Sequence, residues 1–186
     1  SLPSRGLGDV YKRQTLNHTH FDLIKKCIDA KKNILCEKPL AINLEQALEI
    51  RKKLNSSDIF FLEGIAYRSH PQIDFIVKLI NKNEIGRVIK IKSIFGFNAG
   101  KPNIKGRLFN KEFGGGSILD LGCYPVSMSN LIANLDKNNE TPPKIMNVKG
   151  KIFETGVDTE AEANLEYENG ISLSLIHISE PTRRKR

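Results

Sequence analysis

The stretch NILCEKPLAI, residues 33–42, decides the fold of this chain. Its first half is a short apolar run, which is typical of a strand buried in a parallel sheet. A charged pair, Glu37 and Lys38, follows at once, and Pro39 then fixes the backbone. Open parallel sheets bind their ligands beyond the carboxyl ends of the strands. The stretch therefore predicts a functional lysine at the mouth of a sheet.

Lys38 is the candidate proton-transfer group of this stretch. A lysine held at such a mouth can move protons near neutral pH, and a cis bond at Pro39 would hold it at one angle. The alternative is an exposed Glu–Lys pair in front of an ordinary turn proline. The spacing alone does not separate the two.

The segments around this stretch alternate between helix and strand. Apolar residues recur at helical spacing over residues 20–32 and again over 44–54, where Asn43 and Gln46 fit a variant of the capping box. Residues 58–64 form a second short apolar strand. Strand, helix and strand with short connections predict a parallel sheet covered by helices.

Beyond Gly64 the pattern changes. Pro71 suits the first turn of a helix, and alternation over residues 88–94 predicts a half-solvated antiparallel strand. Two further apolar segments flank Asn169-Gly170, a strong hairpin signal. We therefore predict an α/β chain: the C-terminal part of a Rossmann-type parallel domain over residues 15–66, then an α+β domain with a mostly antiparallel open sheet over residues 67–175.

The two ends of the chain carry most of its positive charge. Residues 1–14 hold a net charge of +2 and residues 176–186 a net charge of +3, which leaves +3 of the total of +8. Neither end shows a periodic pattern, and both resemble translated sequencing-adapter sequence. We interpret them as non-native flanks and exclude them from the fold. The alternative is a basic arm that binds polyanions.

Composition narrows the class of protein. The chain of 186 residues is 39% hydrophobic and 27% charged, which is typical of a soluble globular protein. No apolar run approaches the roughly 20 residues of a membrane span. The three cysteines, Cys27, Cys36 and Cys123, are odd in number, widely spaced and set among apolar residues. They predict reduced core thiols in the cytoplasm.

A second motif, GGGSILDLGCY, covers residues 114–124. Asp120 and Tyr124 are four residues apart, so a helix places them on one face, where a carboxylate and a phenol could bind and deprotonate a hydroxyl group. Ser117 is the candidate cap of this helix, and Pro125 predicts a kink one turn in. The alternative is a surface aspartate beside a tyrosine that only packs.

Two polar loops also follow predicted strands and are candidates for ligand contacts. The residues concerned are Asn17, His18 and His20 in the first loop, and Glu63, Tyr67, Arg68 and His70 in the second. Two histidines two residues apart resemble part of a metal site, but the sequence offers no third ligand nearby. We therefore predict no metal. The alternative for the second loop is a solvated connection between domains.

Four segments together resemble one known family. TLNHTH, NILCEKPLAINLEQA, EGIAYRSHP and GGGSILDLGCYPVS closely resemble, in this order, the glucose–fructose oxidoreductase/inositol dehydrogenase (Gfo/Idh/MocA) family over residues 15–175. The tyrosine that ends the motif resembles the dihydrodiol dehydrogenase branch. The resemblance implies an oxidoreductase that uses NAD or NADP and acts on a sugar, polyol or cyclic alcohol. It also implies a homo-oligomer that pairs through the open sheet.

The resemblance also implies roles for particular residues. Lys38 matches the catalytic lysine, Tyr124 the acid/base tyrosine, and Asp120 the aspartate that orients the substrate. The matches on the cofactor side of the cleft are Asn17, His20, Glu37, Lys38 and Arg68. One departure is Leu16, where the family usually has proline.

The family opens with a strand, a G-x-G-x-x-G turn and a helix, which this chain lacks. We therefore expect a fragment, inactive by itself, of an active parent. The sequence specifies neither the substrate nor the choice between NAD and NADP. Two alternatives stay open: a non-catalytic, ligand-sensing relative of the same fold, and a nucleic-acid-binding module that uses the basic ends.

Overall fold

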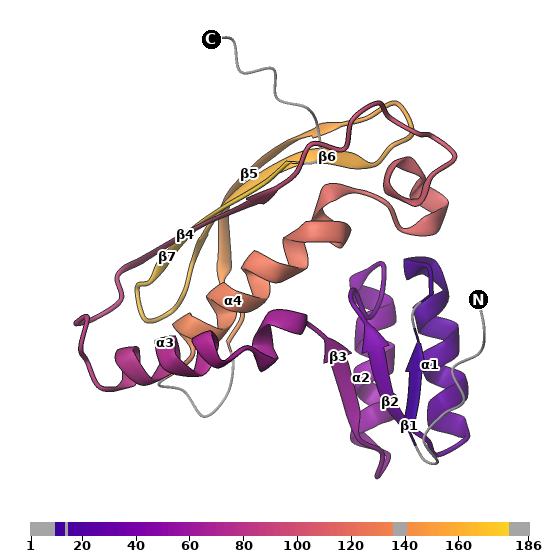
Figure 1. The fold of residues 1–186 in the computed structure, drawn as a ribbon, viewed down its shortest axis with the longest axis horizontal. Helices are drawn as coiled ribbons and strands as arrows, with labels where there is room; N and C mark the ends of the chain where they lie inside the picture. The colour runs from indigo at the N-terminus through magenta and orange to yellow at the C-terminus, as the bar shows by residue number, and fades with distance from the viewer. Residues whose placement is uncertain (1–9, 14, 136–140, 179–186) are drawn as a thin grey trace.

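The structure, a computed structural model, describes residues 10–13, 15–135 and 141–178. Figure 1 shows two sheets, each with its own helices, and one passage of the described chain between them, just after Gly64. We call the part up to Gly64 the first unit and the part from Ile65 the second unit. None of the helices in the described ranges is long and apolar enough to cross a membrane.

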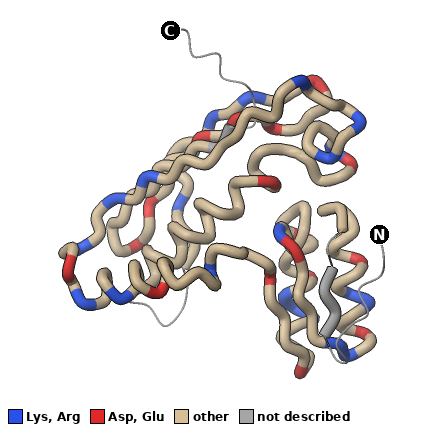
Figure 2. Tube along the Cα trace, viewed as in Figure 1, with Lys and Arg blue, Asp and Glu red and all other residues tan. Residues whose placement is uncertain are grey.

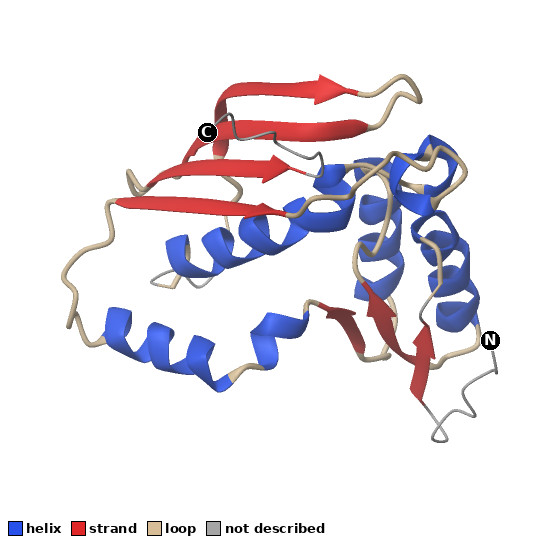
Figure 3. Ribbon diagram, turned by 45° about the horizontal axis from the view of Figure 1, so that its top comes forward, coloured by secondary structure: helices blue, strands red, loops and turns tan. Residues whose placement is uncertain are grey.

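The first unit contains a three-stranded parallel sheet in the order β1-β2-β3. Its elements are β1 (Val10–Arg13), the 3₁₀ turn η1 (Asn17–Thr19), α1 (His20–Asp29), β2 (Asn33–Glu37), α2 (Leu44–Asn55) and β3 (Phe61–Gly64). Ile24 of α1 and Ile50 of α2 share one core with Ile34 and Cys36 of β2. Ile34 and Cys36 lie on the same face of their strand, so both helices cover that face (Figure 3).

The sequence predicted this unit well, with one omission. The parallel sheet is confirmed, and so is the cap of α2, where the Gln46 amide donates to Asn43 Oδ1 at 2.9 Å. However, residues 10–13, which fall in the excluded flank 1–14, form strand β1, and its backbone pairs with β2 from Val10↔Asn33 to Arg13↔Cys36. A strand of four residues is too short to show a period, so its pairing is visible only in the fold. The rest of that flank lies outside the described residues.

The second unit contains a four-stranded sheet in the order β4-β7-β6-β5. Its strands are β4 (Lys90–Gly96), β5 (Lys144–Ile152), β6 (Asp158–Glu166) and β7 (Ser172–Ile178). Its helical elements are η2 (Ala66–Ser69), α3 (Pro71–Asn81), η3 (Arg107–Phe109), η4 (Lys111–Phe113), the π-helical turn η5 (Ile118–Gly122) and α4 (Cys123–Ala133). Strand β7 runs three residues past the predicted boundary at residue 175.

The mostly antiparallel character of this sheet is confirmed, because β5 pairs with β6 and β6 with β7 in antiparallel fashion. The β6–β7 hairpin turns at Asn169-Gly170, as predicted. The prediction that residues 88–94 form an antiparallel strand is wrong, because β4 pairs with β7 in parallel. Alternation reports that one face of a strand is solvated; it does not report the direction of the neighbouring strand.

The two faces of the second sheet differ in polarity. On one face Leu165, Leu173 and Leu175 form a core with Ala133 at the end of α4. The opposite face is charged: Lys149 lies 3.0 Å from Glu162, and Lys90 and Lys92 of β4 are exposed. Figure 2 marks the basic and acidic positions along the strands of this sheet. No described element covers this face, which leaves it open as predicted.

Candidate active site

Lys38 joins the two units. It follows β2 directly, and its ammonium donates a hydrogen bond to the backbone carbonyl of Asp120, 82 residues further along the chain. The same nitrogen lies 3.3 Å from Asp120 Oδ1. The side chains of Lys38 and Asp120 are only 16% and 10% exposed. A lysine from the mouth of one sheet therefore meets a carboxylate of the other unit in a site largely closed to water.

Arg107 is the second cation at this carboxylate. Its Nη1 donates to Asp120 Oδ1 at 2.8 Å, and half of its side chain is exposed. Asp120 thus accepts from one buried and one half-exposed cation. Both ion pairs hold the carboxylate in one orientation.

Tyr124 completes the group. Lys38 Nζ lies 5.1 Å from the centre of its ring, within the range of a cation–π contact. Phe95 of β4 packs edge-on against the same ring at 5.6 Å. Burial raises the pKa of Tyr124, and Cys123, Glu37 and Asp120 raise it further. At neutral pH the phenol is therefore protonated and can donate a proton or a hydrogen bond.

A π-helical turn positions Asp120. The turn η5 immediately precedes α4, and π-turns of this kind occur frequently at functional sites. Pro125, where the sequence predicts a kink, lies in the first turn of α4, just after this π-helical turn, and has no N–H to donate; the kink itself stays a prediction. Asp120 therefore lies on a stretch whose backbone departs from ordinary helix geometry.

Asp158 of β6 fixes the start of this turn. Its Oδ2 accepts from the backbone N–H of Ile118 at 2.7 Å and from the hydroxyl of Ser117. The prediction that Ser117 caps the helix is wrong: its side chain makes no capping bond and donates to Asp158 instead. A side chain 41 residues away performs the capping.

The glycines of the motif permit close packing. A Cβ atom on Gly115 would lie 2.6 Å from the carbonyl oxygens of Arg107 and Leu108 and 2.8 Å from that of Asn110. Gly116 has a φ of +110°, and a Cβ there would lie 2.2 Å from Asp158 Oδ1. The run of glycines therefore brings the Arg107 loop and Asp158 close to the start of the helix.

Two of the residues predicted on the cofactor side share a cavity. Glu37 and Arg68 line a space of about 280 Å³ at the carboxyl ends of β2 and β3, together with Glu63. Arg68 is exposed, and its Nε lies 3.4 Å from the hydroxyl of Ser127 in α4. A carboxylate and a guanidinium in one cavity can bind the hydroxyl and phosphate groups of a nucleotide.

The other two residues predicted on that side lie elsewhere. Asn17 Nδ2 donates to the carbonyl of Gly114 at 2.8 Å, and the neighbouring His18 stacks on Phe113. This contact attaches η1 of the first unit to η4 of the second. His20 is 1% exposed, and both of its ring nitrogens face backbone carbonyls. Direct contact between these two side chains and a cofactor stays a prediction.

No sequence pattern identified Arg107 or Asp158 as residues of the site. Arg107 stands in a loop rich in lysine and glycine, 13 residues before its carboxylate partner, with no periodic relation to it. Asp158 stands at the start of a strand of the second sheet. The only trace of either in the sequence is the glycine run, which signals that other backbone or side chains approach closely.

Among the described residues, no three His, Cys, Asp or Glu side chains are grouped so that they could hold a metal ion.

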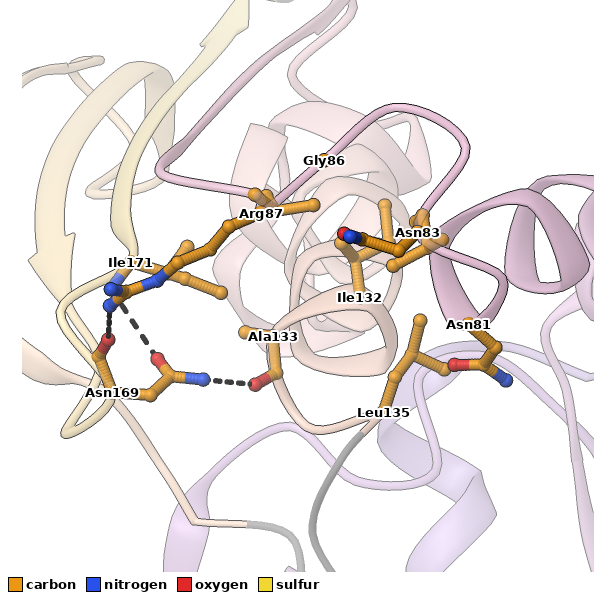
Figure 4. Close-up of a pocket in the computed structure, with 11 residues that line it drawn as sticks. Asn81, Asn83, Gly86, Arg87, Ile132, Ala133, Leu135, Asn169 and Ile171 are labelled. Atoms are coloured by element: carbon orange, nitrogen blue, oxygen red, sulfur yellow. Dashed lines mark hydrogen bonds between the residues drawn. The ribbon is translucent and has the colours of Figure 1, made fainter.

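A larger cavity of about 470 Å³ lies between α3, the end of α4 and the β6–β7 hairpin, shown in Figure 4. There Arg87 donates to the Asn169 carbonyl and Asn169 to the Ala133 carbonyl, at 2.9 and 2.8 Å. No predicted site residue lines it.

Comparison with known proteins gives matches to both units. Residues 10–64 match a family described as "Oxidoreductase family, NAD-binding Rossmann fold". Residues 74–180 match the "GFO/IDH/MocA C-terminal domain".

Two curated relatives illustrate the sequence similarity. Trans-1,2-dihydrobenzene-1,2-diol dehydrogenase of Xenopus tropicalis is 34% identical over 159 residues, covering 86% of this chain and 46% of the relative. D-xylose 1-dehydrogenase (NADP(+)) 2 of Haloferax volcanii is 28% identical over 156 residues, covering 83% and 45%. The chain thus spans about half the length of the curated relatives it matches.

Solved structures share the fold at lower identity. A 3-ketoreductase from Actinomadura kijaniata, KijD10, solved with TDP-benzene and NADP, superposes with a TM-score of 0.81 at 20% identity, covering 96% of this chain and 53% of the other. An aldose-aldose oxidoreductase from Caulobacter crescentus gives a TM-score of 0.80 at 19% identity, covering 91% and 50%. At these identities the similarity describes the fold alone.

Proposed function

The chain belongs to the Gfo/Idh/MocA oxidoreductase family, and from that premise we propose that the full-length protein transfers a hydride between NAD or NADP and an alcohol carbon of a sugar, polyol or cyclic alcohol. One observation carries the proposal most directly. Lys38, Asp120 and Tyr124, from two units, meet in one largely buried group. An ammonium, a carboxylate and a phenol are the groups that hold a hydroxyl and move its proton.

The names of the relatives support the substrate class. One acts on trans-1,2-dihydrobenzene-1,2-diol and another on D-xylose. Both compounds carry hydroxyl groups on neighbouring carbons. We therefore propose a substrate with vicinal hydroxyls on or derived from a ring.

The proposed roles follow from the charges of the site. Asp120 holds the ammonium of Lys38 in place, and Lys38 orients the reacting hydroxyl. Tyr124 passes the proton: its raised pKa makes it a donor when a carbonyl is reduced, and in the other direction the nearby ammonium stabilises the phenolate that must form. A bound NAD or NADP exchanges the hydride with the alcohol carbon.

The residues that would hold the cofactor are Glu37 and Arg68 in their shared cavity, beside Lys38, with Asn17 and His20 as the predicted outer contacts. A guanidinium suits a phosphate, and a carboxylate suits ribose hydroxyls, so the donor set fits a dinucleotide. The volume of the cavity, about 280 Å³, is large enough for one part of a dinucleotide but not for the whole molecule.

We also propose that the full-length protein is a homo-oligomer that pairs through the open, charged face of the second sheet. Rows of lysine and glutamate on that face allow complementary pairing between two copies. Light scattering of the full-length protein measures this directly.

The cysteines support a cytoplasmic location for the protein. Cys36 is buried, Cys123 is half-buried, and both are free thiols, which suits a reducing compartment.

The test uses the full-length protein with NAD⁺ or NADP⁺ and a panel that includes D-xylose and cyclic trans-diols. We expect formation of reduced nucleotide, and Lys38→Ala should lower kcat by about a hundredfold or more, since it removes a proton-transfer group. Lys26→Ala, an exposed lysine on α1, is the matched control and should leave kcat unchanged.

Two outcomes would count against this function. Equal kcat in Lys38→Ala and the intact protein removes Lys38 from the mechanism. Binding of a sugar without any nucleotide reduction favours the ligand-sensing alternative.

A further inference from the structure

Two side chains, one buried and one half-buried, hold the turn that follows Lys38. His20, at the first residue of α1, has its Nδ1 2.7 Å from the carbonyl oxygen of Pro39. Glu63, near the end of β3, accepts from the backbone N–H of Leu40 at 2.8 Å. Two consecutive backbone groups after Lys38 are therefore bound by side chains from two other elements. Neither side chain needs to touch a ligand to influence Lys38.

The ring of His20 is held between two backbone carbonyls. Its second nitrogen, Nε2, lies 3.1 Å from the carbonyl oxygen of Thr15. The ring is 1% exposed. His20 therefore links the chain before η1 to the turn after Lys38.

Glu63 holds the same turn from β3. Burial raises the pKa of Glu63, whereas the Leu40 N–H and the charge of His20 lower it. Glu63 pairs in register with Cys36 on β2, so β3 sets its place beside the turn.

We propose that His20 and Glu63 are positioning residues that hold the Lys38–Leu40 turn and so set the place of the Lys38 amine against Asp120 and Tyr124. The catalytic consequence rests on the function proposed above. A displacement of about 1 Å at a reacting group can cost about a hundredfold in rate. The hydrogen bonds to Pro39 and Leu40 act one and two residues from that group.

The fixed position of His20 is measurable on this chain as it stands. Long-range ¹⁵N–¹H correlation spectra detect the ring N–H groups of histidines. We expect a ring N–H of His20 to exchange slowly with solvent, because the ring is 1% exposed and its Nδ1 lies 2.7 Å from a carbonyl oxygen. His70, which is exposed, is the internal reference. A His20 ring N–H that exchanges as fast as that of His70 overturns the proposal.

Two variants of Glu63 test its hydrogen bond to the turn. Glu63→Ala removes the acceptor of the Leu40 N–H, whereas Glu63→Gln keeps an amide oxygen that can accept in its place. We expect kcat of the full-length protein to fall by about tenfold in Glu63→Ala and to stay near its original value in Glu63→Gln. Equal kcat in the two variants eliminates Glu63 as a positioning residue.

The positioning role is tested by kinetics of the full-length protein. His20→Gln should lower kcat by about tenfold or more with the KM for nucleotide unchanged, while Lys26→Ala should change neither. A direct cofactor contact by His20 would instead raise that KM. If His20→Gln does not fold, Glu63→Ala carries the test.

The outcomes separate this inference from the proposed function. A slowly exchanging His20 ring N–H in a protein that reduces no nucleotide contradicts the proposed function and leaves the hydrogen-bonded turn intact. An active protein in which both His20→Gln and Glu63→Ala keep full kcat overturns the positioning role.

Discussion

The two units place their site residues by different means. In the first unit Lys38 follows β2 directly, so the end of a strand fixes its place. In the second unit Asp120 lies in a π-helical turn, and its surroundings come from Arg107, 13 residues earlier, and from Asp158, on a strand of the sheet. The first arrangement can be seen in a short stretch of sequence. The second arrangement exists only once the chain has folded.

The contact between the units should be the most sensitive point. Asp120→Asn keeps the shape of the side chain but leaves Lys38 and Arg107 without their shared negative charge. We expect kcat/KM of the full-length protein to fall by about a hundredfold, because the Lys38 amine loses its fixed position. Asp74→Asn, on the exposed face of α3, should leave it unchanged. Similar kinetics for the two variants would mean that each unit works without this link.

The close packing around the glycine run should respond next. Gly115→Ala places a methyl group against three carbonyl oxygens, and we expect urea unfolding to show a loss of about 2–3 kcal/mol in the free energy of unfolding. Gly100→Ala is the comparison: its φ is +70° but the space around it is open, so the cost should be about 1 kcal/mol. Equal costs at the two positions would show that the loop yields easily.

The smallest predicted effect compares one thiol from each unit. Burial is the main cause that raises the pKa of Cys36 to about 12 and that of Cys123 to about 11; Glu63 contributes to both rises, and Lys38 offsets part of the rise at Cys123. Both thiols therefore stay protonated below those values, and the reactive thiolate becomes more abundant as pH rises. Between pH 7 and 9 we expect iodoacetamide to alkylate Cys123 about tenfold faster than Cys36, with each rate rising with pH. Cys36 reacting as fast as a small free thiol would contradict the closed core of the first unit.

Much of the fold was predictable because local patterns carry it. The apolar run of residues 33–37, the cap at Asn43 and the hairpin at Asn169-Gly170 all correspond to elements of the structure. Strand β1 and the parallel partner of β4 were not predicted. Both depend on which strand lies alongside, and no short window of sequence contains that information.

The residues of the site were predictable where they stand in local motifs. Lys38, Asp120 and Tyr124 stand in motifs that signal a strand end and a helix face, and the structure brings the three together. Their roles in hydride transfer stay a prediction. Arg107 and Asp158 act through the contacts they make across the fold, so the motif shows their presence only through the glycines that accommodate them.

The described chain passes between the two sheets once, just after Gly64. Because one covalent connection joins the two described units, a gene could exchange one of them and keep the other. Recombination at this point in an ancestral gene would replace the whole second unit and leave the lysine, its strand and its turn untouched. The incoming unit would have to present an aspartate to Lys38 and a fitting contact for Asn17. It would also replace Arg68, so the cavity that Arg68 shares with Glu37 would keep only the side formed by the first unit.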